Sequence, residues 1–157
     1  MPYLKPEEAL TRISGFTREE IRPGIAEDRE FLRDQAGSMS STLRFLAREI
    51  ELREDVVDEQ AATLKGSLAA ASEELASIEG SEPVEDAVAD GLDRLNALET
   101  MDVYRREQVS LDTCNEVLAA IDDHLEGAAA RRVRRPVYEF IDTRFQLQRK
   151  ILGRSSD

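Results

Sequence analysis

An all-α fold is predicted by three features of the sequence. Ala, Glu, Leu and Arg dominate the composition, tryptophan is absent, and aromatic residues make up 5% of the chain. No proline interrupts the chain from Ile25 to Ile78, where apolar side chains return every three or four residues. This spacing is typical of a helix that packs on another helix. We therefore predict a single all-α domain of 157 residues, built on a long helix over residues 25–79.

Two short N-terminal helices are predicted before the long one. Pro6-Glu7-Glu8 is typical of a first helical turn, and Gly15 is expected to end this helix. Thr17-Arg18-Glu19-Glu20 then has the pattern of a capping box, with Phe16 and Ile21 placed for a hydrophobic staple. Pro23-Gly24 is expected to end the second helix.

The long helix carries a heptad seam that changes phase after Val57. A break at Gly37-Ser38 or at Gly66-Ser67 is the alternative to one continuous helix. A break would interrupt the seam, so we predict a continuous helix and an elongated molecule.

A return helix is predicted over residues 83–130. Gly80 ends the long helix and Ser81-Glu82-Pro83 begins the next, and so short a connection predicts an antiparallel hairpin. A turn centred on Ser81 would pair Val57 with Tyr104 and Ala36 with Leu125. A break within 110–116 stays open, because residues 113–116 have the pattern of a second capping box.

A last helix is predicted over residues 136–152, followed by a tail at 153–157, because Gly127 and Pro136 are expected to end the return helix. Most aromatic residues lie near the two chain ends, and large side chains fill thick cores. We therefore predict that residues 1–55 and 109–152 form a base of three or four helices. Residues 56–108 would form an arm of two helices.

The arm is expected to make the protein a homodimer. It is rich in small residues, and two helices alone bury little apolar surface. Pairing with a second copy would complete a four-helix bundle. The residues assigned to this contact are Leu64, Leu68, Leu75, Leu92 and Leu95.

The charge of the chain is strongly acidic, with 33 Asp and Glu against 21 Lys and Arg and a formal net charge of −12. Only Lys5, Lys65 and Lys150 are lysines. An acid excess with so few lysines indicates halophilic adaptation, in which carboxylates keep the surface hydrated, and predicts that the fold is lost when salt is removed. The alternative is an acidic binding face for a basic partner.

A basic segment near the C-terminus stands against this acidic background, with Arg131, Arg132, Arg134 and Arg135. These residues are candidates for contact with nucleic acid or another anion. The alternative is that the segment docks on the acidic bundle of its own chain or of its partner. No aromatic residue lies within the arginine run to stack on bases.

No enzyme signature is found in the sequence. His124 is the single histidine and Cys114 the single cysteine, too few for a di-iron bundle or a thiolate metal site. There is no glycine-rich phosphate loop. We therefore predict no catalytic residue, cofactor, metal or small-molecule substrate. No apolar run spans a bilayer and no signal-peptide core is found, so a cytoplasmic protein without membrane contact is expected.

One short motif, Ala62-Thr63-Leu64-Lys65-Gly66-Ser67, resembles the active helix of histidine phosphotransfer domains, which reads His-x-Leu-Lys-Gly-Ser and belongs to an elongated helical bundle. Ala62 stands at the phosphoacceptor position. The resemblance therefore implies a degenerate module that docks without transferring phosphate.

The function predicted from the sequence is that of a non-enzymatic helical interaction or assembly protein, an adaptor with a possible protein partner. The first alternative is a small nucleic-acid-associated regulator that uses residues 131–135. The second alternative is the degenerate phosphotransfer module.

Overall fold

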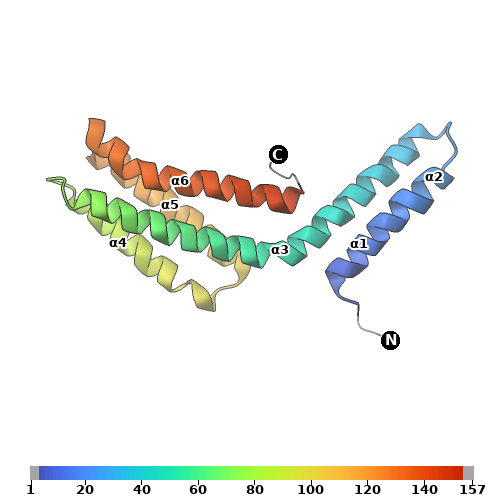
Figure 1. Ribbon diagram of the computed structural model, residues 1–157, viewed down its shortest axis with the longest axis horizontal. Coiled ribbons are helices and arrows are strands. Elements are labelled where there is room, and N and C mark those ends of the chain that lie inside the picture. Colours follow the sequence, from blue (N-terminus) through green and yellow to red (C-terminus); the bar gives the residue numbers. More distant parts are fainter. Residues whose placement is uncertain (1–3, 154–157) are drawn as a thin grey trace. The chain divides into compact units, whose positions relative to one another are not determined.

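The structure, a computed structural model that describes residues 4–153, is built from helices, and no strand occurs in that range (Figure 1). This confirms the predicted all-α helical bundle. The elements in chain order are α1 (Pro6–Phe16), a π-helical turn (Thr17–Ile21), α2 (Arg22–Gly24), α3 (Glu30–Leu75), α4 (Glu82–Asn96), a 3₁₀ turn (Leu98–Thr100), α5 (Val103–His124) and α6 (Gly127–Leu152). Within residues 4–153, no helix has a stretch long and apolar enough to cross a membrane.

The chain divides into two compact units. Residues 1–54 and 149–157 form the first, which we call the N-terminal unit, and residues 55–148 form the second, which we call the bundle unit.

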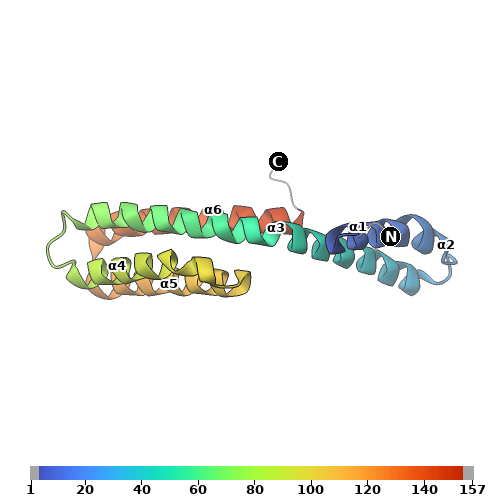
Figure 2. The ribbon, with the colours of Figure 1, turned by 90° about the horizontal axis from the view of Figure 1, so that it is seen from below.

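The bundle unit is a four-helix arrangement made by the last part of α3 with α4, α5 and α6. The four segments lie side by side and alternate in direction (Figures 1 and 2). Every one of them contributes to a single apolar core, as expected when each helix buries one stripe against its neighbours. Its fully buried members include Leu64, Leu68, Leu75, Val84, Leu95, Val117, Ile121, Val133, Val137 and Phe140.

The predicted return helix over 83–130 is wrong, because the chain reverses between Asn96 and Val103. The Asp102 side chain accepts hydrogen bonds from the backbone N–H groups of Tyr104 and Arg105, each at 3.0 Å, and so caps the start of α5. Leu125 belongs to the core of the bundle unit, whereas Ala36, its predicted partner, belongs to the N-terminal unit. The alternative break within 110–116 is not found either, since these residues lie inside α5.

The last helix begins at Gly127 and not at Pro136 as predicted. Gly127 has φ 58°, a backbone conformation that glycine adopts without steric cost, and it directs the chain from α5 into α6. Pro136 lies inside α6, where it lacks the N–H that would bond to the carbonyl of Arg132. Packing of Val133 and Val137 in the core holds the helix together on both sides of the proline.

The predicted continuity of the long helix is confirmed. α3 runs without interruption through Gly37-Ser38 and Gly66-Ser67, although it is shorter at both ends than the predicted 25–79. At its C-terminal end the Ser81 hydroxyl donates a hydrogen bond to the carbonyl of Ile78 at 2.7 Å. Gly80, with φ 76°, makes the turn into α4.

In the N-terminal unit, residues 6–24 form one helical run that lies antiparallel to the first part of α3 (Figure 1). Gly15 does not end the helix, and Thr17 does not cap a second one. Instead the Thr17 hydroxyl donates to the carbonyl of Ile13 at 2.8 Å, and the backbone widens into a single π turn. The two predicted short helices are therefore one element.

The predicted aromatic core at the chain ends is also wrong. Tyr3, one of the aromatic residues assigned to it, lies outside the described residues; of those within residues 4–153, only Phe140 is fully buried, and it belongs to the bundle unit. Several of the others lie on the surface, with Phe16 59%, Phe31 72%, Tyr138 52% and Phe145 64% exposed.

Candidate interaction surfaces

The five leucines assigned to a dimer contact lie in the bundle unit. Leu64, Leu68, Leu75 and Leu95 are fully buried, and Leu92 is half-buried against the same core. Their neighbours come from α3 to α6 of one chain, which leaves the four buried side chains no surface for a second copy. A homodimer stays a prediction, but it needs another surface.

The contact between α1 and α3 in the N-terminal unit is made by small and polar side chains. Ser14 and Ser40 face each other between α1 and α3: the Ser14 hydroxyl donates to the Ser40 carbonyl at 2.8 Å, and the Ser40 hydroxyl donates to the Ser14 carbonyl at 2.9 Å. Thr17, Ala36 and Ala47 are buried beside them. Small residues and direct hydroxyl-to-backbone bonds bring the helices close together, so there is little space for large side chains in this contact.

Several large apolar side chains of α1 and α3 lie beside this contact, on the surface of the unit. Six of them lie on the same side of the helix pair: two come from α1 and four from α3, and each exposes two fifths of its area or more. They are Ile13 (50%), Phe16 (59%), Leu32 (41%), Met39 (47%), Leu46 (40%) and Ile50 (53%). We call these six residues the apolar face.

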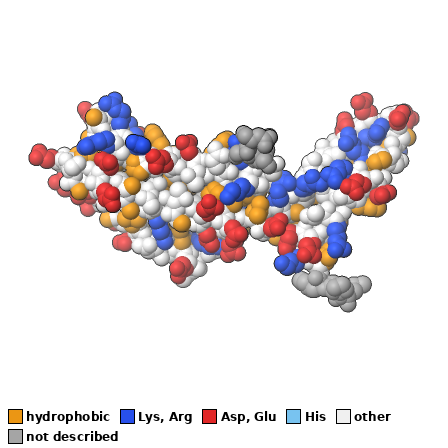
Figure 3. Space-filling view, in the orientation of Figure 1, with side chains coloured by type: hydrophobic (Ala, Val, Ile, Leu, Met, Phe, Trp, Pro, Cys, Tyr) orange, Lys and Arg blue, Asp and Glu red, His pale blue; other side chains and the backbone are white. Residues whose placement is uncertain are grey.

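The six residues share one side of the helix pair. At 100° per residue, the α3 members form a stripe on one side of the buried Ala36 and Ser40, and Ile13 and Phe16 lie to one side of Ser14 and Thr17. Because α1 and α3 are antiparallel, both stripes fall on the same side of the plane through the two helix axes. Figure 3 shows mainly charged and polar side chains on this unit, including a row of Lys and Arg.

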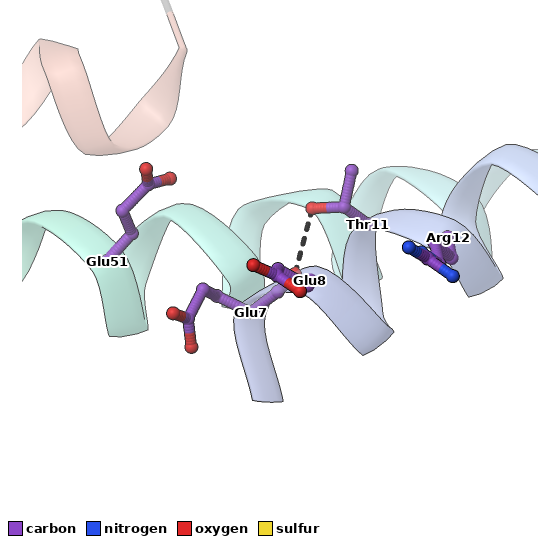
Figure 4. Close-up of a pocket in the computed structure, with 5 residues that line it drawn as sticks. All are labelled: Glu7, Glu8, Thr11, Arg12 and Glu51. Atoms are coloured by element: carbon purple, nitrogen blue, oxygen red, sulfur yellow. Dashed lines mark hydrogen bonds between the residues drawn. The ribbon is translucent and has the colours of Figure 1, made fainter. Parts of the chain in front are cut away.

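A pocket of about 290 Å³ lies between α1 and α3 of the same unit (Figure 4). It is lined by Glu7, Glu8, Thr11, Arg12 and Glu51, and the Thr11 hydroxyl is bonded to the carbonyl of Glu7 at 2.9 Å. The carboxylates of Glu7 and Glu51 point away from each other in the close-up. Residues 4–153 contain no group of three His, Cys, Asp or Glu side chains arranged to hold a metal ion. The pocket therefore offers no convergent site.

The basic segment lies on α6, where three of its four arginines make ion pairs with acids of the same chain. Arg132 pairs with Glu74 of α3 at 3.8 Å, and Arg135 pairs with Glu139 at 3.4 Å. Arg134 is hydrogen-bonded to the carboxylate of Asp122 at the end of α5. These pairs favour docking of the segment on its own bundle over contact with nucleic acid.

A groove on α6 combines arginines with an aromatic side chain that the sequence reasoning missed. It has a volume of about 450 Å³ and is lined by Arg131, Arg134, Arg135, Tyr138, Glu139 and Asp142. Tyr138 follows Arg134 by one helical turn, so it shares their face only because α6 continues through Pro136. Tyr138 could be assigned to this face from the sequence only if the helix was expected to continue through Pro136.

Replacing Arg131, Arg132, Arg134 and Arg135 together with glutamine is expected to lower the stability of the bundle unit by about 0.6–3 kcal/mol, because three exposed ion pairs are lost and each contributes ~0.2–1 kcal/mol. Thermal melting followed by circular dichroism measures the loss. Arg131→Gln alone is the control, since Arg131 is exposed and takes part in none of these three ion pairs, and it should leave melting unchanged. Unchanged melting of the fourfold variant with lost retention on nucleic acid would instead support the nucleic-acid alternative.

The single cysteine is unsuited to nucleophilic chemistry. Cys114 is buried in the core of the bundle unit, and burial raises the pKa of its thiol to about 11, although the Arg144 guanidinium acts in the opposite direction. His124 is exposed at the end of α5. Neither residue lies in a site with the features of an active centre.

The motif that resembles a phosphotransfer helix lies on α3 within the bundle unit. Ala62 is exposed and lines a pocket of about 280 Å³ that also includes Lys65, Arg106 and Asp58. Arg106 and Asp58 form an ion pair across that pocket. The position that corresponds to the phosphoacceptor is thus at the surface, where it holds a methyl group and no titratable side chain.

Comparison with known proteins adds no relative: the chain matches no protein-family model, no curated protein and no solved structure.

Proposed function

We propose that this protein is a non-enzymatic interaction module whose N-terminal unit assembles with a protein partner through the apolar face. The observation that carries the proposal is the contrast between the small and polar contact of α1 with α3, with Ser14 and Ser40 at its centre, and six large apolar side chains on one side of the unit. Two helices with so little buried apolar area are marginal in water. A contiguous exposed apolar patch with a polar rim is typical of a protein interaction site.

The distribution of charge supports this assignment. Residues 1–54 and 149–157 carry 12 basic and 12 acidic side chains, so the formal charge of the N-terminal unit is zero. Residues 55–148 carry 9 basic and 21 acidic side chains, which accounts for the whole net charge of −12. The bundle unit thus has the charge that keeps a surface solvated, while the N-terminal unit can approach a partner of either sign without net repulsion.

A photo-crosslinking experiment tests the proposal. A benzophenone amino acid at Met39 of the full chain is expected to form protein adducts in native lysate, because Met39 lies in the apolar face. The matched control is the same amino acid at Ser41, which is exposed on the polar side of α3. The adduct should also disappear when Leu32 and Leu46 are replaced with glutamate.

Adducts of equal yield at the two positions, or adducts that survive the glutamate substitutions, would show that the apolar face is not the contact. No adduct at either position would reject the proposed function.

A further inference from the structure

We infer that the occupant of the apolar face is the same face of a second copy of this chain. The two N-terminal units would then form a symmetric homodimer, in which two pairs of helices complete a four-helix bundle. This inference rests on the proposed function and names its partner. It moves the dimer contact from the buried leucines of residues 56–108 to the opposite end of α3.

The area of the face is sufficient for a dimer. Taking about 180 Å² for a large apolar residue, the exposed fractions of the six residues correspond to roughly 500 Å² per copy. Two copies would bury about 1,000 Å² of apolar surface before any polar rim is counted. This is about the smallest total area expected of a specific interface. Covering this surface would also add buried apolar area beside the small and polar side chains of the contact between α1 and α3.

The spacing of the face fits helix-on-helix packing. Leu32, Met39 and Leu46 are separated by seven residues each, and Ile50 follows Leu46 by four, which is the spacing of a stripe that packs on another helix. In a two-fold dimer each patch meets an identical patch, and an extended stripe of similar apolar side chains can meet itself in antiparallel orientation. The Ser14–Ser40 contact places α1 alongside the middle of the α3 stripe, so Ile13 and Phe16 lie near the centre of the paired surface.

Charge also favours a second copy over an anionic partner. The N-terminal unit has a formal charge of zero, with acids and bases in equal number, so two N-terminal units meet without net repulsion. An anionic membrane surface or a nucleic acid would gain no net attraction from this unit and would be repelled by the −12 of the bundle unit.

Light scattering coupled to size exclusion tests the inference with the full chain. The unaltered protein is expected to have twice the 17.6 kDa mass of one chain. Leu32→Glu combined with Leu46→Glu should give the mass of one chain at the same concentration, because two charges per copy would be buried without partners, and association should weaken about a hundredfold or more. Ser41→Glu, which adds an acid on the other side of α3, should remain a dimer.

A second measurement keeps the inference testable if the double variant loses its fold. Met39→Cys should react with a maleimide more slowly than Ser41→Cys, and the difference should vanish on dilution as the dimer dissociates. Cys114 adds little background, because it is buried and its pKa is raised to about 11. A single-chain mass for the unaltered protein, a dimer unaffected by the double variant, or equal labelling at the two cysteines would overturn the inference.

The two proposals fail in different ways. A single-chain mass together with an adduct from Met39 to a different protein would reject the homodimer and leave the interaction module standing. A single-chain mass with no adduct dependent on the apolar face would reject both.

Discussion

Replacing Leu68 with alanine is expected to lower the free energy of unfolding of the bundle unit by about 2–5 kcal/mol, the range observed when a buried leucine is truncated and a cavity remains. Leu68 has 0% exposed surface, and its neighbours belong to α3, α4 and α5 of the same chain. The loss should therefore be independent of protein concentration. Urea unfolding followed by circular dichroism, at two concentrations that differ about a hundredfold, measures both quantities.

The control for this experiment is Ile141→Ala on α6. Ile141 belongs to the same unit and is 40% exposed, so its truncation should cost about 1 kcal/mol or less. A loss for Leu68→Ala that shrinks as concentration rises would place this side chain in an interface between copies, as the sequence predicted. A concentration-independent loss would place it in the interior of one chain.

The periodic pattern of the sequence predicted the fold class and the continuity of α3, because both depend on local spacing. It did not predict how many times the chain reverses. The apolar positions continue at helical spacing from Val84 through Leu98 and on to Leu111, so nothing in the period marks the turn. The physical marker is Asp102, whose carboxylate caps α5 through the N–H groups of Tyr104 and Arg105.

Pro136 caused the opposite error, because a helix end was predicted where the helix continues. A proline ends most helices, and the run before it contains Gly127, so the return helix was expected to end near residue 130 and a new helix to begin at 136. In the structure the connection is only Leu125 and Glu126, and the apolar stripe of Val133, Val137 and Phe140 continues across the proline. Core packing on both sides outweighs the missing hydrogen bond.

The candidate interaction surface could be predicted only in part. The heptad positions of α3 were visible in the sequence, but their regular spacing does not show which of them are buried and which are exposed. That division follows from Ser14, Thr17 and Ser40, which fill the contact with α1 and leave Leu32, Met39 and Leu46 outside it. Large apolar residues were expected in the interior because most of them are buried in globular proteins. In this unit the close approach of α1 and α3 excludes them from the contact between the two helices.

Replacing each of two helical glycines with alanine should change the free energy of unfolding in opposite directions. A Cβ added at Gly91 of α4 would lie 2.9 Å from Cγ2 of Thr113 and 3.2 Å from Cδ1 of Leu68, closer than side chains pack. Overpacking of this kind costs about 1–3 kcal/mol, and the higher helix propensity of alanine returns at most ~1 kcal/mol of it. Gly91→Ala is therefore expected to lower the stability of the bundle unit by about 1–2 kcal/mol.

Gly66 of α3 provides the matched substitution within the same unit. A Cβ added there meets nothing within 4 Å, so Gly66→Ala should raise stability by about 0.5–1 kcal/mol through the reduced freedom of the unfolded chain. Urea unfolding of both variants beside the unaltered protein measures the two shifts in one assay. The close approach of α3, α4 and α5 at Gly91 predicts shifts of opposite sign. Two stabilising shifts would mean that the three helices are further apart at Gly91 than the structure places them, since only added space could accommodate the extra methyl group.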